Sequence, residues 1–340
     1  MGRVDGGAAG GPRGGAVTGR LAFAKYQGAG NDFVVVDGRR PPAAGGGPAD
    51  RDAERDPDRD WAALALRLCD RHFGVGADGL LVAAPPTGTG AALQMLMYNP
   101  DGSLAEMCGN GLRCFVRWLV DRGEAGGGRL PVETGAGVLT ADVGPDGRVE
   151  VNMGPPRLQP AAIPLDPAAA GAAGAPPGGP VLALPLEVPP VAAFPGARYE
   201  ATCVSMGNPH AVVFVPDAAA VPLEVVGPVL ETHPAFPART NVEFCQVIDP
   251  GRIRVRVWER GAGITLACGT GACAAAVAAR LRGYVHDRVV VELPGGALTV
   301  VWPGDPVSPA GPPATVSTGA LPPVFLGGPA AHVFDGAVPL

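Results

Sequence analysis

The chain has 340 residues, which leaves room for about two domains of ordinary size. Lys and Arg number 26 and Asp and Glu number 32, and the resulting net charge of −6 argues against a protein that binds nucleic acid. No apolar run approaches the ~20 residues of a membrane-spanning helix, and residues 1–20 lack the apolar stretch of a secretory signal. Seven cysteines in such a chain are typical of the reducing cytoplasm and not of a disulfide scaffold. We therefore expect a cytoplasmic protein that binds neither nucleic acid nor membrane.

The first half of the chain is expected to form several strands and one early helix. Residues 1–20 are rich in glycine and predict a flexible tail, and residues 41–60 predict a solvated loop. Short strands are expected at 23–26 and 33–37, and the leucines of 61–72 favour a helix. Further strands are expected at 80–84, 93–98, 129–133, 137–143 and 148–153, the last two joined by a hairpin.

Two similar turns divide the chain into halves. An amphipathic helix begins just after Cys108-Gly109-Asn110-Gly111, and an Ala-rich helix follows Cys268-Gly269-Thr270-Gly271, 160 positions later. This repetition indicates an internal duplication, with two similar domains that face each other. Residues 155–180 are poor in charge and rich in Ala, Pro and Gly, so they predict a linker between the halves 21–154 and 181–328.

Cys108 and Cys268 are the strongest candidates for chemistry. A cysteine at a helix N-terminus lies among unpaired N–H groups at the positive end of the helix dipole, and both effects favour the thiolate and lower the thiol pKa. The neighbouring glycines let the backbone approach a ligand, and the same N–H groups can bind a carboxylate. Two such sites face to face would place a thiolate and a thiol on opposite sides of one carbon, which suits inversion of a stereocentre.

The remaining cysteines and the histidines predict neither a metal site nor redox chemistry. Free cysteine often packs as a small hydrophobic residue, and this is our interpretation of Cys69, Cys114, Cys203, Cys245 and Cys273. No close cysteine pair and no ligand spacing among the five histidines indicates a zinc site, so we expect no metal. The glycine motifs of nucleotide-binding folds are absent as well.

Six blocks of the sequence carry a resemblance to a known family. They are Gly28-Ala29-Gly30-Asn31-Asp32-Phe33, Asn99-Pro100-Asp101-Gly102-Ser103, Met107-Cys108-Gly109-Asn110-Gly111-Leu112-Arg113-Cys114, Gly207-Asn208-Pro209-His210, Thr240-Asn241-Val242-Glu243-Phe244, and Glu259-Arg260-Gly261-Ala262-Gly263 with Ala267-Cys268-Gly269-Thr270-Gly271-Ala272. Together they resemble diaminopimelate epimerase, and they occur in that family's order from about residue 21 to the C-terminus. The segment 331–336 also resembles the family's closing strand, so residues 329–340 are expected to return to the N-terminal half.

The resemblance implies a cofactor-independent epimerase that interconverts LL- and meso-2,6-diaminopimelate, on the route to lysine and peptidoglycan precursors. Cys108 and Cys268 would be the two acid/base cysteines and would exchange roles with the direction of the reaction. The implied fold is α/β in the broad sense (α+β), with two pseudo-symmetric domains, each a mixed β-sheet wrapped around a central α-helix, and the implied assembly is a homodimer. Pyridoxal phosphate would need a Schiff-base lysine, and nothing marks Lys25, the single lysine, for that role.

The resemblance also implies roles for other residues by matching position. His210 and Glu259 would adjust the ionisation of the two cysteines, with Glu259 also near a substrate ammonium group, and Arg260 would pair with a substrate carboxylate. The nearer carboxylate would meet the helix-terminal donors, and asparagines would bind the polar ends of the substrate. The donors are Gly109, Asn110, Gly269 and Thr270, and the asparagines are Asn31, Asn99, Asn208 and Asn241. Considered alone, each asparagine could simply form a turn, and Arg260 could form a surface ion pair that contributes about 0–1 kcal/mol to stability. The order of the motifs along the chain favours the functional interpretation.

Three positions depart from the family's pattern. Gly79 stands where some members have a glutamine that helps to hold the substrate, and Ile264 stands in place of the acid of the usual Arg-Gly-Ala-Gly-Glu-Thr. Phe334 lacks the hydroxyl of a tyrosine in the closing strand. Gly79 affects a substrate contact, Ile264 removes a charge next to the catalytic loop, and Phe334 affects the dimer contact.

Three other functions compete with this hypothesis. The chain could be an epimerase or racemase of another amino acid, of the proline-racemase kind, although the arginine and asparagines that would hold a second amino-acid end favour diaminopimelate. It could also be a non-catalytic binding module for dicarboxylic amino acids, whose binding would survive loss of both cysteines. A thiol redox protein would need a close cysteine pair, which the sequence lacks.

Overall fold

The structure is a computed structural model that describes residues 19–39, 59–176, 178–191, 194–305 and 321–339. The tail expected at 1–20 lies outside the described residues up to position 18, and its last residue, Arg20, already begins the first strand. The loop expected at 41–60 lies outside them up to position 58.

The first half has its strands where the sequence predicts them. The strands expected at 80–84, 93–98, 129–133, 137–143 and 148–153 are confirmed as β3, β4, β6, β7 and β8. The early helix α2 ends at Cys69 and not at residue 72, because Asp70 accepts the backbone amides of His72 and Phe73, both at 2.7 Å, and holds them in a turn. The elements are β1 (Arg20–Gly28), β2 (Asn31–Asp37), α2 (Trp61–Cys69), β3 (Gly79–Ala84), β4 (Leu93–Tyr98), β5 (Leu104–Ala105), α3 (Gly109–Asp121), β6 (Gly128–Thr134), β7 (Gly137–Val143) and β8 (Val149–Asn152).

The second half repeats this order after two short helices. Its elements are η1 (Pro160–Ala162), α4 (Pro167–Ala172), β9 (Leu184–Val188), β10 (Ala197–Ser205), β11 (Pro209–Phe214), α5 (Leu223–Glu231), β12 (Asn241–Asp249), β13 (Arg252–Glu259), β14 (Gly263–Thr265), α6 (Gly269–Leu281), β15 (Arg288–Leu293), β16 (Gly296–Val301), β17 (Phe325–Gly328) and β18 (Ala331–Pro339).

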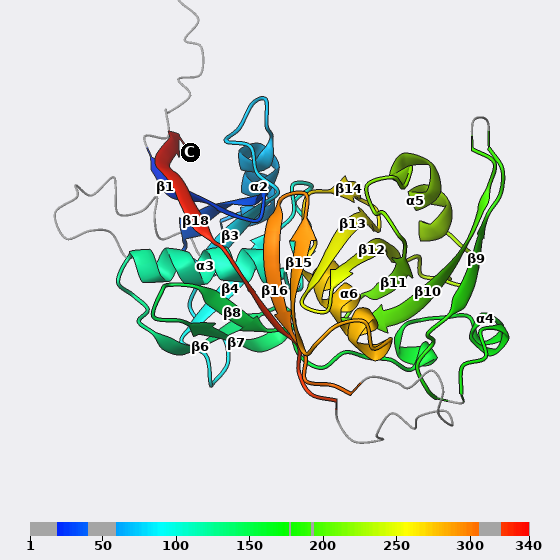
Figure 1. The fold of residues 1–340 in the computed structure, drawn as a ribbon. Coiled ribbons are helices and arrows are strands. Elements are labelled where there is room, and N and C mark those ends of the chain that lie inside the picture. The colour runs from blue at the N-terminus through cyan, green and yellow to red at the C-terminus, as the bar shows by residue number, and fades with distance from the viewer. Residues whose placement is uncertain (1–18, 40–58, 177, 192–193, 306–320, 340) are drawn as a thin grey trace, which may run out of the picture.

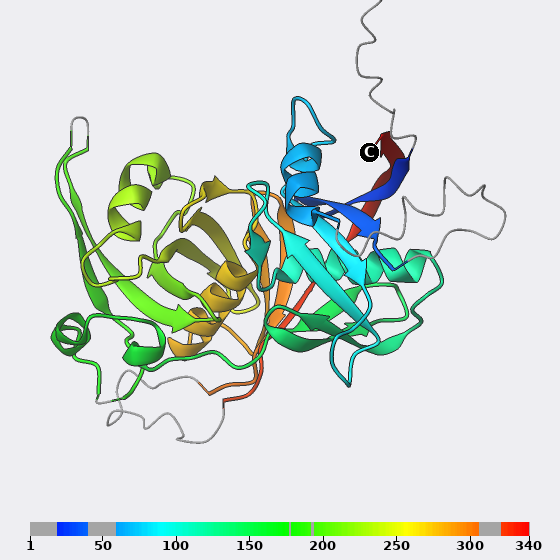
Figure 2. The ribbon, with the colours of Figure 1, turned by 180° about the vertical axis from the view of Figure 1, so that it is seen from behind.

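Strand pairing confirms the internal duplication. β1 pairs antiparallel with β2 and β2 runs parallel to β3, just as β10 pairs antiparallel with β11 and β11 runs parallel to β12. Likewise β4 runs parallel to β6, and β13 runs parallel to β15. The two halves lie side by side, each with one helix inside its sheet (Figures 1 and 2).

Two pairings join the halves to each other. β8 pairs antiparallel with β17, with Val151 opposite Leu326, so one sheet runs through both halves. β18 pairs antiparallel with β1 along its whole length, from Arg20 opposite Pro339 to Gln27 opposite Ala331. The last strand therefore packs in the half where the chain begins, while the domain boundaries themselves stay a prediction.

The helices α3 and α6 form the centres of the two halves. α3 contacts β1, β2, β4, β7, β8 and β18, and α6 contacts β10, β11, β12, β13, β15, β16 and β17. α6 is rich in alanine because strands surround it on many sides, and small side chains let them approach closely. In each half the strands of this mixed sheet thus wrap a central helix, which confirms the expected α+β class.

Residues 155–180 contain more structure than the linker predicted there. They include η1 and α4, and Asp166 caps α4 by accepting the backbone amides of Ala168 and Ala169 at 2.9 and 3.0 Å. Ile163 and Leu165 are buried in a core shared with β9, β10 and α5. The segment therefore joins the halves but packs onto the second one, because its few large apolar residues are enough to anchor it.

Candidate active site

Cys108 and Cys268 occupy equivalent positions at the starts of the two central helices. Each is the N-cap of its helix, with extended backbone angles (φ −142° and ψ 118° for Cys108, φ −124° and ψ 116° for Cys268). Each Sγ accepts the backbone amide three residues later, from Gly111 and from Gly271, at 3.3 Å in both cases. The helices thus begin where the Cys-Gly-x-Gly turns predict, and each sulfur lies against the N–H groups of a first helical turn.

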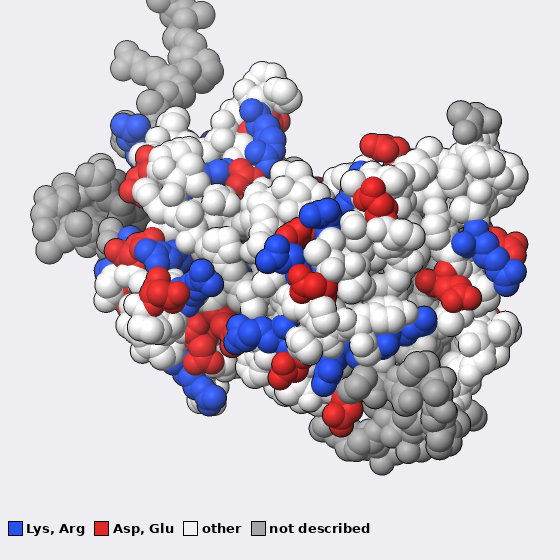
Figure 3. All heavy atoms as spheres, in the orientation of Figure 1, with Lys and Arg blue, Asp and Glu red and all other residues white. Residues whose placement is uncertain are grey.

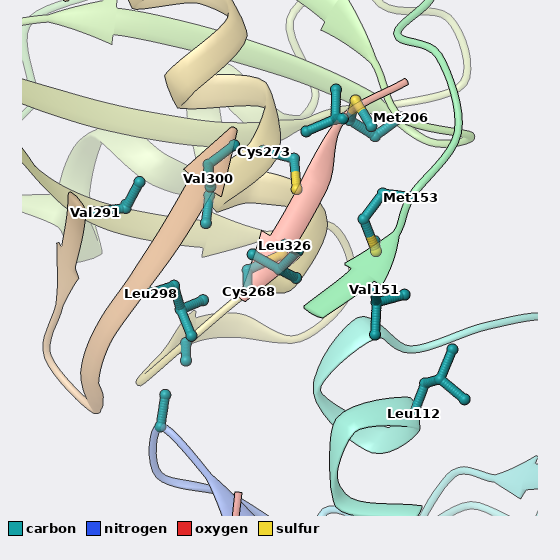
Figure 4. Close-up of a cluster of buried hydrophobic side chains, with 14 of the residues drawn as sticks. Leu112, Val151, Met153, Met206, Cys268, Cys273, Val291, Leu298, Val300 and Leu326 are labelled. Atoms are coloured by element: carbon teal, nitrogen blue, oxygen red, sulfur yellow. The ribbon is translucent and has the colours of Figure 1, made fainter. Parts of the chain in front are cut away.

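The two helix starts converge on one residue of β17. A Cβ placed on Gly109 would lie 3.0 Å from Cδ2 of Leu326, and a Cβ on Gly269 would lie 3.2 Å from the same atom and 3.8 Å from the backbone N of Asn110. Leu326 lies beside Cys268, with Met153 at the end of the neighbouring strand (Figure 4). The β8–β17 pairing that joins the halves therefore also brings the two cysteine turns together.

A tight hairpin turn adds a second contact between the halves. β1 and β2 are joined by Ala29 and Gly30, whose φ values of 53° and 81° match a type I′ turn. A Cβ on Gly30 would lie 3.1 Å from Cα of Gly295 and 3.5 Å from Leu266, which is two residues before Cys268. The start of β2, with Asn31, is thereby held close to both cysteine turns.

Burial changes the expected ionisation of the thiols. Burial raises the pKa of Cys108 and raises that of Cys268 well above its usual value, and the carboxylate of Glu259 raises both further. The backbone amides at each helix start lower the pKa, as expected, but they do not outweigh the loss of water. The prediction of lowered thiol pKa values is therefore wrong for this structure.

Neutral amides surround Cys108. Oδ1 of Asn31 lies 3.9 Å from Sγ and also accepts Nδ2 of Asn110 at 3.4 Å, while Nδ2 of Asn31 donates to Asp78 at 2.7 Å. Asn99, in contrast, lies in the turn before β5 and donates to Ser103 Oγ at 2.9 Å. The structure thus brings Asn31 and Asn110 to the cysteine and shows Asn99 as a turn residue.

A chain of polar side chains leads away from Cys268. Oγ1 of Thr270 lies 3.5 Å from Sγ and accepts Nδ2 of Asn208 at 3.4 Å. Oδ1 of Asn208 pairs with Nε2 of His210 at 2.9 Å, and Nδ1 of His210 pairs with Glu243 at 2.7 Å. His210 therefore contacts neither sulfur directly, and it reaches Cys268 through Asn208 and Thr270.

The loop after β13 presents Glu259 and Arg260. Thr265 donates to Oε1 of Glu259 at 2.5 Å, which holds this carboxylate near both thiols. Arg260 is exposed and donates to the carbonyl of Ala238 at 3.1 Å, while its backbone amide donates to Oδ1 of Asn241 at 2.9 Å. The side chain of Asn241 also donates to Pro209 O at 2.8 Å, so in this structure it ties three strand ends together.

Sequence reasoning missed two charged residues under the site. Glu243 is fully buried beside His210, and burial raises its pKa. Arg113 is also fully buried, and its Nη2 donates to Oδ1 of Asn110 at 2.7 Å. Both lie inside the sequence blocks quoted above, and the available signal was a charged residue next to apolar residues.

The three departures from the family's pattern have definite surroundings. A Cβ on Gly79 would lie 3.1 Å from the carbonyl of Tyr98, so a longer side chain there would require β3 and β4 to shift. Ile264 lies in β14 opposite Trp258 and is 42% exposed. Phe334 in β18 packs edge-on against Phe23 with ring centroids 5.9 Å apart. Nothing in the structure explains why Ile264 replaces an acid.

Other kinds of site are less well supported. Within the described ranges no group of three or more His, Cys, Asp or Glu side chains is arranged to hold a metal ion, and no helix there is long and apolar enough to cross a membrane. Acidic and basic side chains are interspersed on the face seen in Figure 3. A hollow of about 1660 Å³ lies over β1, β18 and α3, but none of the candidate site residues lines it.

Comparisons with known proteins point to one family. The sequence profile of the family described as diaminopimelate epimerase matches residues 23–159 and 202–319. Diaminopimelate epimerase of Pelotomaculum thermopropionicum is 48% identical over 323 residues, which cover 94% of this chain and 99% of that protein. Diaminopimelate epimerase of Moorella thermoacetica is 44% identical over 324 residues, which cover 94% and 100%.

Solved structures share the fold at low sequence identity. A hydroxyproline epimerase from Agrobacterium vitis matches with a TM-score of 0.61 and 18% identity, over 94% of this chain and 93% of that one. A probable proline racemase from Agrobacterium radiobacter matches with a TM-score of 0.59 and 17% identity, over 93% and 92%. These likenesses support the α+β fold with two similar halves.

Proposed function

The chain belongs to the diaminopimelate epimerase family and is an isomerase, and we propose that it interconverts LL- and meso-2,6-diaminopimelate with two acid/base cysteines. The observation that carries this proposal is the convergence on Leu326 of the two turns that begin with the N-cap cysteines Cys108 and Cys268, because Cβ atoms on Gly109 and Gly269 would lie 3.0 and 3.2 Å from its Cδ2. A pair of thiols at facing helix starts suits inversion at one carbon, because one can remove a proton while the other supplies one from the opposite side.

The reaction balances without a further acid or base. The thiolate of one cysteine takes the α-proton, so that an S–H bond forms as the C–H bond breaks. The electron pair left on the α-carbon spreads into the adjacent carboxylate and then takes the proton of the second thiol on the opposite face. The cysteines have then exchanged protonation states, and the reverse reaction follows the same path.

Burial strengthens the base in this scheme. Because burial raises the pKa of both Cys108 and Cys268, a thiolate formed here binds a proton more strongly than an exposed thiolate does. In this proposal the backbone N–H groups of the two helix starts would bind the carboxylate next to the reacting carbon, where negative charge develops. The helix-start donors are Gly109, Asn110, Gly269 and Thr270.

The other end of the substrate would meet the loop after β13. The exposed guanidinium of Arg260 would bind the distal carboxylate in a bidentate pair, and the carboxylate of Glu259 would bind an ammonium group. The remaining polar ends would be bound by Asn31, Asn99, Asn208 and Asn241. We place the reaction in the cytoplasm, on the route to lysine and peptidoglycan precursors.

We also propose that the protein is a homodimer, with β18 at the contact. In the described part of the chain β18 pairs with β1 alone, and Val333 and Phe334 are 52% and 44% exposed. An unpaired edge with exposed apolar side chains is suited to pairing with a second copy. Light scattering after gel filtration should give the mass of a dimer, and a monomer at micromolar concentration would contradict the proposal.

The experiment that tests the proposed reaction is proton exchange at the α-carbon. Reduced protein is incubated with LL-diaminopimelate in heavy water without pyridoxal phosphate, and the products are followed by NMR and chiral separation. Deuterium incorporation with formation of the meso isomer supports the proposal, and Cys108→Ala and Cys268→Ala should each abolish epimerisation. Exchange on proline but not on diaminopimelate would favour the proline-racemase kind, and binding without exchange would favour a binding module.

A further inference from the structure

The two cysteine sites are equivalent in backbone but not in charge. When the sequences of the two halves are aligned so that Cys108 matches Cys268, Asn110 matches Thr270 and Arg113 matches Cys273. The first half therefore has a cation where the second half has a neutral thiol. This difference matters because both positions are fully buried, where charge acts over short distances with little screening.

Arg113 is an unusual buried cation. Its guanidinium donates to Oδ1 of Asn110, but within the described part of the chain its Nε and Nη1 have no hydrogen-bond partner and no carboxylate is paired with it. An arginine remains charged in proteins, so this residue holds a positive charge in the core. Leaving such donors unpaired is costly, which argues for a role that compensates the cost.

The surroundings of Arg113 direct it toward the start of α3. Side chains on a helix lean toward its N-terminus, and the bond to Asn110 brings the guanidinium one turn back toward Cys108. Glycines leave room for it, because a Cβ on Gly28 would lie 3.3 Å from Nη2 and a Cβ on Gly328 would lie 3.4 Å from Nε and Cζ. The guanidinium is therefore held under the helix start by β1, β17 and α3 together.

The contact with Asn110 also determines how that amide is oriented. Arg113 can only donate, so the atom of Asn110 that it meets must be the oxygen. Nδ2 of Asn110 then faces Asn31, whose Oδ1 lies 3.9 Å from Sγ of Cys108. Arg113 thereby orders the polar groups beside this cysteine as well as adding charge beneath it.

We propose that Arg113 is a positioning residue that fixes the Asn110 amide and makes Cys108 the first of the two thiols to ionise, so that Cys108 is the resting base. The charged groups that act on Cys108 are Arg113, which favours the thiolate, and Glu259, which opposes it. Those that act on Cys268 are the carboxylates of Glu259 and Glu243, which both oppose its ionisation. The assignment of the base rests on the proposed two-cysteine reaction.

Alkylation of each cysteine tests this without turnover. Reduced protein is exposed briefly to limiting iodoacetamide between pH 7 and 12, and modification of Cys108 and of Cys268 is quantified by peptide mass spectrometry. In the wild-type protein the midpoint of Cys108 should lie at lower pH than that of Cys268. Equal or reversed midpoints would overturn the proposal, and this comparison needs no variant.

Variants separate charge from packing. Arg113→Met should raise the Cys108 midpoint by about 1 pH unit or more and leave that of Cys268 unchanged, whereas Arg113→Lys, which keeps the charge, should preserve most of the wild-type value. Arg148→Met, a substitution at an exposed arginine, is the control and should shift neither. A folded Arg113→Met protein with both midpoints unchanged would overturn the role of Arg113.

The outcome can be separated from a failure of the proposed reaction. A protein that shows these midpoints but exchanges no deuterium with diaminopimelate would contradict the proposed function and not the effect of Arg113 on Cys108. Deuterium exchange with midpoints that do not respond to Arg113 would support the function and overturn the inference.

Discussion

The hydroxyl of Thr270 lies between Cys268 and the buried polar residues behind it, 3.5 Å from Sγ and 3.4 Å from Nδ2 of Asn208. Because Asn208 donates to this oxygen, the hydroxyl proton is free to point at the sulfur and to stabilise the thiolate. Thr270→Val keeps the shape of the side chain and removes this donor. A hydrogen bond to a charged group contributes about 1.5–3 kcal/mol, so kcat/KM should fall about 10- to 150-fold.

A matched substitution serves as the control for this experiment. Thr202 is buried in β10 and donates to the carbonyl of Leu182 at 2.8 Å, with no contact to either catalytic candidate. Thr202→Val should therefore lower the free energy of unfolding by about 1 kcal/mol and leave kcat/KM unchanged. Both enzymes are assayed by conversion of LL- to meso-diaminopimelate with unfolding followed in urea. A Thr270→Val enzyme with the kcat/KM of the wild type would refute the role of the hydroxyl.

Burial raises the pKa of Asp32, but hydrogen bonds from charged partners, among them the buried Lys25, outweigh it and bring the pKa from 3.8 to about 2. This contributes about 2 kcal/mol above pH 4, so Asp32→Asn should lower the free energy of unfolding by that amount at pH 7, and its difference from the wild type should shrink as the pH falls from 4 toward 2. Gly271→Ala should destabilise the protein by about 1–3 kcal/mol in urea unfolding and lower kcat, because its Cβ would lie 2.8 Å from the buried carboxylate of Glu243. Glu231 accepts the indole N–H of Trp258 in β13 at 2.7 Å and the backbone amide of Gly261, in the loop that presents Arg260, at 3.1 Å. Because Glu231→Gln weakens the hold on this loop, it should raise KM more than it lowers kcat in steady-state assays.

Each of these expectations has a result that contradicts it. For Asp32→Asn it is a free-energy difference that does not change between pH 7 and pH 3. For Gly271→Ala it is wild-type stability, which would mean that Glu243 moves away at no cost. For Glu231→Gln it is a fall in kcat with KM unchanged, which would mean that this carboxylate does not act through the loop that presents Arg260.

Local sequence predicted the starts of both central helices. An N-cap and the glycines that follow it act within a few residues, so Cys108 and Cys268 could be placed at helix starts without knowledge of their neighbours. The strands of the first half were predictable for the same reason, since alternation and turn residues are local signals. The helix expected at 61–72 ends at Cys69 because the side chain of Asp70 accepts the backbone amides of His72 and Phe73. This effect is local too, but the spacing of the leucines did not reveal it.

The environment of the thiols could not be predicted in this way. The sequence indicated helix N-termini and therefore lowered pKa values, but burial between two halves that are distant in the chain reverses the direction. His210 was expected to act on a cysteine, and its contact with Glu243 depends on the parallel pairing of β11 with β12, which joins residues 33 positions apart.

Local signals in the chain were enough to predict two similar halves, each with one cysteine at a helix start, because caps and turns depend on residues that are close together in the sequence. The packing of distant segments, in contrast, brings the two cysteine turns together at Leu326. It also places Arg113 under the start of α3 and Glu243 next to Gly271, close to Cys268. These contacts join residues far apart in the chain, and the ionisation of a buried thiol depends on the water excluded and the charges brought close by that packing.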